Sequence, residues 1–261
     1  MAAELRELGS QSIWVVDEGE GPAIIFIHGL GGTSNVFDPA ATALGGDHRV
    51  ICFDLTGHGM SPPSKVTSIS GWADDVVAIL DDRGVEVASI VAHSMGTIIA
   101  QEVVAAHVHR VDKIALLGPI RDVAPAGRQA QRDRAALVRS SGMAAVAHTI
   151  SRSATSATVQ AEQPAVVAFV KELLQRQSPD GYAAACEALA ESSPPDVSTV
   201  ERPVLLVTGS DDGVSPADRL GDIAAAFRSA RTAVIDGVGH WTPIEAAAEV
   251  NRLLTDFFAK D

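Results

Sequence analysis

Short apolar runs rich in β-branched residues recur along the chain and alternate with longer stretches of helical periodicity. The runs predict seven strands: Ser12–Val16, Ala23–Ile27, Val50–Phe53, Ser89–Ala92, Lys113–Leu117, Val204–Thr208 and Thr232–Ile235. Several are apolar at every position, which is typical of parallel strands covered by helices on both faces. The stretches between them predict helices at Ile69–Asp82, with Ser70 as its N-cap, and at Met95–His107, Arg219–Ala226 and Ala246–Ala259. This alternation predicts an α/β fold with a mostly parallel, doubly wound sheet.

The alternation breaks between residues 119 and 198, where no run predicts a strand. Stretches rich in Ala, Gln and Arg predict four helices there: Arg128–Ser140, Met143–Ser151, Gln163–Arg176 and Gly181–Glu191. We interpret the Ser/Thr-rich patch Ser151–Thr158 as a loop. The sequence therefore predicts a core made of residues 1–118 and 199–261, and a helical cap, residues 119–198, inserted before the last core strands.

Composition narrows the class of protein and of partner. An apolar fraction of 46% in 261 residues is sufficient for one sizeable core. The formal charge of −13 argues against nucleic acid or an anionic membrane as a partner. Two cysteines, Cys52 and Cys186, are too few for a disulfide framework. Residues 1–10 are polar, and no apolar stretch reaches the ~18–20 residues that span a bilayer, so we expect a cytoplasmic protein. Oligomeric state stays open.

The segment SIVAHSMGTIIA, residues 89–100, carries the main chemical signal. An apolar strand runs into a turn with Ser94 at its centre, and an aliphatic helix follows. The residues two positions to either side, Ala92 and Gly96, are both small, as a sharp turn that exposes a serine hydroxyl requires. Ser94 would stand at the N-terminus of a helix, where backbone N–H groups favour negative charge. We interpret Ser94 as a catalytic nucleophile.

A serine nucleophile needs a general base and an acid that orients that base. His240 lies in a Gly-rich loop, GVGHW, between the last predicted strand and the last helix, and we predict it as the base. The acid is expected on the loop after strand Val204–Thr208, where Asp211 and Asp212 compete. The chain order serine, acid, histidine is preserved with either aspartate.

Acyl transfer also needs donors for the developing oxyanion. The backbone N–H of Met95 directly follows the nucleophile. The loop after Ala23–Ile27 reads HGLGGT, and we predict the N–H of Leu30 as the second donor, with Gly29 beside the substrate. We assign His28 a structural role beneath this loop. The loop lacks the Gly-Lys-Ser/Thr ending and G-x-G-x-x-G spacing of nucleotide sites.

Other polar residues receive structural interpretations. Asp54 and His58, in DLTGHGMS, could pass for an acid–base pair, but the glycines around them favour a tight connection near the site. The remaining histidines show no ligand spacing with nearby acids. We therefore expect neither a metal ion nor a cofactor.

These motifs resemble, in order and spacing, the α/β-hydrolase superfamily: His28-Gly29, Asp54…Ser61, Ala92–Gly96, Gly209–Asp212 and Gly239-His240. The resemblance covers roughly residues 12–118 and 199–259. It implies an α/β-hydrolase fold, and it favours Asp212, which falls on the last position of the superfamily's Gly-x-x-Asp pattern. The stretch RQSPDGYAAACEA, residues 176–188, is similar to the lid of the 3-oxoadipate enol-lactonase and small-ester hydrolase group.

The resemblance implies a serine hydrolase that cleaves a small-molecule carboxylic ester or lactone through an acyl-enzyme on Ser94. Substrate contacts are expected from five residues: Gly29, His93, Trp241, Phe169 and Tyr182. Two alternatives stay open. The same triad serves carbon–carbon bond hydrolases and cofactor-independent dioxygenases or lyases, and some superfamily members only bind ligands.

Overall fold

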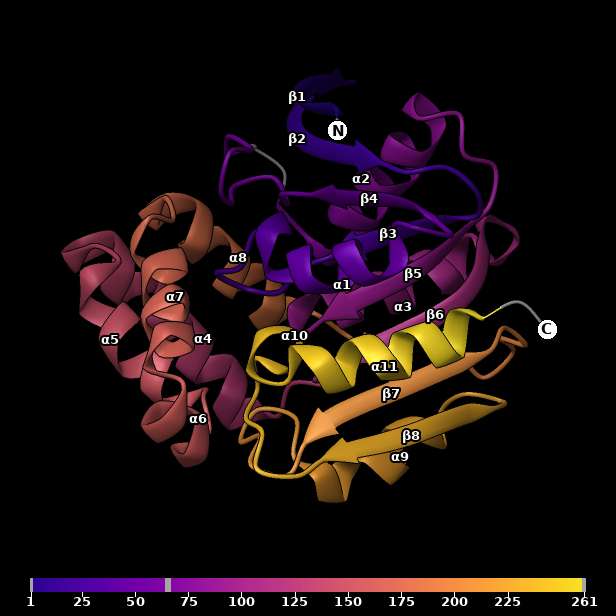
Figure 1. Ribbon diagram of the computed structural model, residues 1–261. Helices are drawn as coiled ribbons and strands as arrows, with labels where there is room; N and C mark the ends of the chain where they lie inside the picture. Colours follow the sequence, from indigo (N-terminus) through magenta and orange to yellow (C-terminus); the bar gives the residue numbers. More distant parts are fainter. Residues whose placement is uncertain (1, 64–66, 260–261) are drawn as a thin grey trace.

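Eight strands form one sheet in a computed structural model that describes residues 2–63 and 67–259 (Figure 1). Residues 1, 260 and 261, at the ends of the predicted core segments, and residues 64–66 lie outside it. The sheet order is β1-β2-β4-β3-β5-β6-β7-β8. Strands β1 and β2 pair antiparallel with their neighbours, and all later pairs are parallel. The strands are β1 Ala2–Leu8, β2 Gln11–Glu18, β3 Ala23–Ile27, β4 Arg49–Phe53, β5 Ala88–His93, β6 Val111–Leu117, β7 Val204–Gly209 and β8 Ala230–Ile235.

The central strands are buried on both faces, as their continuous apolar runs predict. In β3, Ile25 and Ile27 pack into one hydrophobic cluster, while Ile24 and Phe26 pack into the other. Helices α2 (Ile69–Asp82), α3 (Met95–Ala106) and α9 (Leu220–Ala224) contribute to the first cluster. Helices α1 (Asp38–Leu44) and α11 (Ala247–Phe258) cover the opposite face and lie side by side in Figure 1. The predicted doubly wound α/β architecture is confirmed.

Five helices lie in the chain between β6 and β7. They are α4 Pro125–Ser141, α5 Ala144–Ser153, α6 Ala157–Glu162, α7 Pro164–Gln175 and α8 Pro179–Glu191. Figure 1 shows them grouped on the side of the molecule to which the arrowheads of β7 and β8 point. This edge is where α/β folds place their sites.

The structure differs from the sequence prediction in several short elements. Strand β1 and helices α1 and α6 were not predicted, and α6 occupies part of the patch interpreted as a loop. The predicted last helix, Ala246–Ala259, is α11, and a short helix that was not predicted, α10 (Thr242–Glu245), precedes it; Ala246, with φ −133° and ψ 46°, separates the two. Short 3-10 turns η1 (Ser34–Phe37), η2 (Val108–Arg110) and η3 (Ala217–Arg219) complete the chain.

Helix α2 spans Ile69–Asp82 as predicted, but its N-cap is a different serine. The side chain of Ser68, rather than that of Ser70, accepts the N–H of Gly71 at 3.0 Å. Ser68 has the extended backbone that an N-cap requires, whereas Ser70 already lies inside the helix. The N-cap prediction was therefore wrong by two residues. Across residues 2–63 and 67–259, no helix is long and apolar enough to cross a bilayer.

Candidate active site

Ser94 stands at the tip of a sharp turn between β5 and α3. Its backbone has φ 54° and ψ −123°, and among the described residues it is the only non-glycine with positive φ. The Ser94 N–H donates to the carbonyl of Leu117, and the Ser94 carbonyl accepts the N–H of Thr97, so both sides of the turn are held. A side chain in this conformation is strained, and such strain persists where the surrounding structure fixes it.

Two glycines make room for this turn. A Cβ atom on Gly96 would collide with the carbonyl oxygens of Ile27 and His28, so α3 can pack against the end of β3 only with glycine there. A Cβ atom on Gly29 would lie 2.7 Å from the Cβ of Ser94 and 3.3 Å from its hydroxyl oxygen. The loop after β3 therefore approaches the serine as closely as a backbone can.

The predicted triad residues form one chain of contacts. The Nε2 atom of His240 lies 2.7 Å from the Ser94 hydroxyl oxygen, and Nδ1 lies 2.8 Å from Oδ2 of Asp212. A carboxylate can only accept, so Nδ1 carries the proton and Nε2 keeps a lone pair toward the serine hydroxyl. This tautomer is the one in which a histidine accepts a proton from serine.

Asp212 is held in the orientation that this contact needs. Its Oδ1 atom accepts the N–H groups of Val214 and Ser215, each at 2.8 Å. Burial favours a higher pKa for this carboxyl, but the contacts with His240 and with these two N–H groups outweigh it and hold the pKa below its usual value. Asp212 is therefore ionised at neutral pH. Asp211 is exposed and contacts Ser210 instead.

The predicted oxyanion loop is braced from beneath by His28. The Leu55 N–H donates to Nε2 of His28 at 2.9 Å, so the proton sits on Nδ1, which donates to the Gly29 carbonyl at 2.9 Å. Burial lowers the pKa of His28 to about 4, which keeps the ring neutral. Leu30 follows Gly29, and Met95 begins α3, so both backbone segments flank Ser94.

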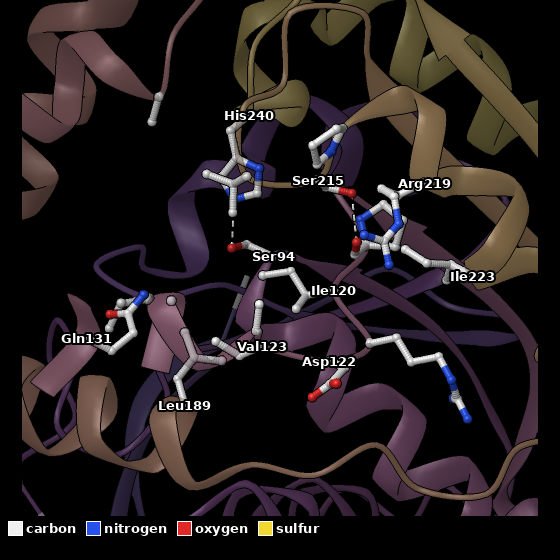
Figure 2. Close-up of a pocket in the computed structure, with 18 of the residues that line it drawn as sticks. Ser94, Ile120, Asp122, Val123, Gln131, Leu189, Ser215, Arg219, Ile223 and His240 are labelled. Carbon is white, nitrogen blue, oxygen red and sulfur yellow. Dashed lines mark hydrogen bonds between the residues drawn. The ribbon is translucent and has the colours of Figure 1, made fainter. Parts of the chain in front are cut away.

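A cavity of about 550 Å³ opens over Ser94 and His240 (Figure 2). Gln131 on α4 and Leu189 on α8 lie on one side of the nucleophile, and Arg219 and Ile223 lie on the other. Apolar groups make up more of the wall than polar ones, but five charged side chains also line the cavity: Arg121, Asp122, Arg134, Arg219 and Asp222.

Comparisons with known proteins decide the family. A family model described as the alpha/beta hydrolase fold matches residues 22–247. This chain belongs to the alpha/beta hydrolase fold family.

Individual relatives of this α/β hydrolase are named as enzymes that act on ester or lactone bonds. The chain is 29% identical to 3-oxoadipate enol-lactonase 2 of Acinetobacter baylyi over 200 residues, 76% of this chain and 74% of that protein. It is 26% identical to esterase YbfF of Escherichia coli, over 88% of this chain and 91% of that protein. The crystal structure of the enol-lactonase from Burkholderia xenovorans LB400 superposes with a TM-score of 0.93 at 24% identity, over 98% of this chain and 100% of that chain. The resemblance seen in the motifs is confirmed.

The predicted substrate contacts of the α/β hydrolase divide into two groups. Tyr182 and Trp241 line the cavity, as does Leu30. Gly29, His93 and Phe169 lie outside its lining in the described part of the chain: Gly29 lies beneath Ser94, and Phe169 packs against the second hydrophobic cluster.

His93 supports the loop of the catalytic histidine. Its Nε2–H donates to the His240 carbonyl at 2.8 Å, and its ring centroid lies 5.4 Å from that of Trp241. Burial lowers the pKa of His93 to about 3, with the neighbouring His240 adding to the effect, so the ring is neutral. A buried neutral ring that donates to the backbone has the geometry of a support.

Two residues at the site were not predicted from the sequence. Gly118, directly after β6, has φ 56°, and a Cβ atom there would lie 3.0 Å from Cε1 of His240. Glu245 accepts backbone N–H groups on both sides of His240. A glycine directly after a predicted central strand was the available signal for Gly118, whereas Glu245 carried none.

The structural interpretation of Asp54 is confirmed. Asp54 accepts the N–H groups of Ser34 and Met60, at 2.7 and 2.8 Å, and so ties two loops together. The His58 ring packs between His28 and Trp72. Within residues 2–63 and 67–259, no group of three or more His, Cys, Asp or Glu side chains is arranged to hold a metal ion.

Proposed function

We propose that this α/β hydrolase cleaves a carboxylic ester or lactone through an acyl-enzyme on Ser94. The observation that carries the proposal is the unbroken chain of contacts from Asp212 through His240 to the Ser94 hydroxyl. Relatives named as an enol-lactonase and an esterase support the choice of bond.

The reaction would proceed in two steps. His240 takes the proton of Ser94 as the hydroxyl oxygen attacks the substrate carbonyl, and the N–H groups of Leu30 and Met95 bind the oxyanion. His240 then gives its proton to the leaving alcohol or enol oxygen, which departs. Water, deprotonated by the same imidazole, releases the acid and restores Ser94. Asp212 stabilises the imidazolium in both steps.

The inserted helices, residues 119–198, would act as a cap that shapes the substrate pocket. Their residues Gln131 and Leu189 face the nucleophile from one side, and Ile223 faces it from the core side (Figure 2). The acyl group and the leaving group would occupy these two sides. A volume of about 550 Å³ suits a small or medium substrate.

One end of the cavity favours a substrate with a carboxylate. Two arginines of α4, Arg128 and Arg139, form ion pairs with nearby carboxylates. Arg134, on the same helix, lines the cavity beside the Tyr182 hydroxyl and is joined to no carboxylate within the described residues. A guanidinium that lines a cavity and has no carboxylate partner is suited to bind a substrate carboxylate with two parallel hydrogen bonds.

Labelling tests the acyl-enzyme. We expect a fluorophosphonate probe to attach to the peptide that contains Ser94, and p-nitrophenyl acetate to be hydrolysed. Ser94→Ala would abolish both, whereas Ser89→Ala, at a buried serine on strand β5 before it, would retain both. Turnover by Ser94→Ala at the wild-type rate would overturn the proposal and favour a reaction in which only the histidine acts. Absence of labelling in the folded wild type would favour a binding role.

A matched pair of esters tests the anionic group. Mono-p-nitrophenyl adipate and p-nitrophenyl hexanoate have acyl chains of equal length and differ in the terminal carboxylate. Arg134→Met should lower kcat/KM for the adipate ester by about 10–100-fold, the value of a hydrogen bond pair between charged groups, and leave the hexanoate ester unchanged. Arg132→Met, an exposed arginine of the same helix, is the control. An equal effect on both esters would refute recognition of the carboxylate.

A further inference from the structure

The backbone around His240 is held by groups outside its own loop. The N–H of Gly239 donates to Oε2 of Glu245 at 3.0 Å, and the N–H of Trp241 donates to Oε1 at 2.8 Å. The N–H of His240 itself donates to the carbonyl of Ala154 at 2.9 Å. Three consecutive N–H groups are thus satisfied, and one carboxylate holds both residues that flank the histidine.

The same carboxylate reaches the inserted helices. The N–H of Ser156, in the joint between α5 and α6, donates to Oε2 of Glu245 at 2.9 Å. A Cβ atom on Gly239 would lie 2.6 Å from this N–H and 2.9 Å from both carboxylate oxygens, so the three groups are in close contact. Glu245 therefore joins two segments that are more than eighty residues apart in the sequence.

The environment of Glu245 is unusual for a carboxylate. Its relative exposure is 4%, and its hydrogen-bond partners are three backbone N–H groups. Burial raises its pKa, while these three donors and the nearby His240 act in the opposite direction. A buried charge without a cationic partner is costly, and such groups concentrate at functional sites.

The joint between α5 and α6, to which Glu245 is hydrogen-bonded, forms part of the cavity wall. Ala154 lines the cavity and also accepts the His240 N–H, two residues before Ser156. A substrate that contacts Ala154 is therefore one hydrogen bond away from the backbone of the histidine. A displacement of about 1 Å in a catalytic group lowers rates by about 100-fold, so a rigid connection here matters for turnover.

We propose that Glu245 is a positioning residue for His240, which fixes the backbone on both sides of the histidine and ties it to the cap side of the cavity. This inference rests on the proposed function, because it assigns Glu245 to the reaction on Ser94. Glu245 acts through His240 and does not touch the reacting atoms.

Glu245→Gln tests the role with little change of shape. The amide oxygen can replace Oε2 and keep the donors from Gly239 and Ser156, which places an NH₂ group against the N–H of Trp241. We expect kcat for p-nitrophenyl acetate to fall by about 10–100-fold with KM changed less than about threefold. The rate of fluorophosphonate labelling of Ser94 should fall by the same factor. Glu249→Gln, an exposed residue paired with Arg252, is the control.

A pH profile separates positioning from general support of the fold. The charged or titratable groups that face His240 are Asp212, His93 and Glu245. Removing the Glu245 charge should move the acidic limb of kcat/KM to lower pH, because a nearby negative charge favours a protonated imidazole. Glu245→Asp keeps the negative charge on a shorter side chain, so the acidic limb of its kcat/KM profile should stay in place while kcat falls. Loss of thermal stability with kcat and limb unchanged would mean a structural role only.

The two proposals fail in distinguishable ways. If the wild type is not labelled at Ser94, the proposed function is wrong. If the wild type is labelled and folded Glu245→Gln is labelled as fast, only the positioning role is overturned. Where Glu245→Gln does not fold, the kcat of Glu245→Asp decides, and a value within threefold of wild type overturns the inference.

Discussion

Replacing Asp212 by asparagine should reverse the protonation of His240 while leaving the shape of the site intact. Oδ1 of Asp212 accepts two N–H groups, from Val214 and Ser215. An amide nitrogen cannot accept, so the asparagine oxygen must occupy this position, and the NH₂ group takes the position of Oδ2, 2.8 Å from Nδ1 of His240. Nδ1 must then accept, and the ring proton moves to Nε2, where it blocks removal of the serine proton.

The expected loss follows from this wrong tautomer. A serine–histidine pair with its acid amidated loses about 10³–10⁴-fold in kcat, which corresponds to roughly 4–5 kcal/mol of barrier. The assay is kcat for p-nitrophenyl acetate together with the rate of fluorophosphonate labelling of Ser94, each measured on protein whose melting temperature matches wild type. Both rates should fall by the same factor.

Asp211→Asn is the matched control, since its side chain is exposed and contacts Ser210. It should retain activity within twofold of wild type. The reasoning is refuted if folded Asp212→Asn keeps kcat within about tenfold of wild type, or if Asp211→Asn produces the larger loss.

Three further predictions concern stability and reactivity. Burial raises the pKa of Asp75 to about 6, so the folded protein loses stability as this carboxyl ionises between about pH 4 and 6. Asp75→Asn should therefore be more stable than wild type by about 1–3 kcal/mol at pH 8. In thermal melts this difference should vanish below pH 4. An unchanged melting temperature at pH 8 would contradict this burial cost. Gly118→Ala should lose about 1–2 kcal/mol of stability because of the positive φ at this position. Its kcat should fall by about 10–100-fold because the new methyl group contacts the His240 ring. Full activity in this variant would show that the ring has room to move. Burial raises the pKa of the Cys186 thiol to about 12 and raises that of Cys52 as well. A thiol reagent such as Ellman's reagent should therefore not react with native protein at pH 8, but should titrate both cysteines in denaturant. Rapid reaction of the native protein would contradict their burial.

The sequence predicted the parts of the fold whose pattern is set by local burial. The seven predicted strands have near-continuous apolar runs or clear alternation, and all of them are strands in the structure. Strand β1, with the sequence AAELREL, has charged residues along a sheet edge, where few side chains are buried and the apolar signal is weak. Helix α6 has six residues, too few for a helical period to be visible.

The site was predictable as far as each motif is local. The serine turn and the glycine-flanked histidine carry their chemistry within five residues, and the structure brings Ser94, His240 and Asp212 together. The predicted cavity contacts of His93 and Phe169 depended instead on which way a side chain points, and the fold turns both of them away from the cavity lining. Glu245 illustrates the limit, since it precedes α11 and is indistinguishable in sequence from an exposed helical acid.

The left-handed backbone of Ser94 has a consequence for protein engineering. A residue held in that conformation gives up of the order of 1–3 kcal/mol of stability, and glycine at the same position would not. Random libraries of this protein that are screened for heat resistance alone should thus enrich glycine at position 94, together with the loss of the nucleophile. Directed evolution toward a hardier catalyst has to select for turnover and thermal tolerance in the same round.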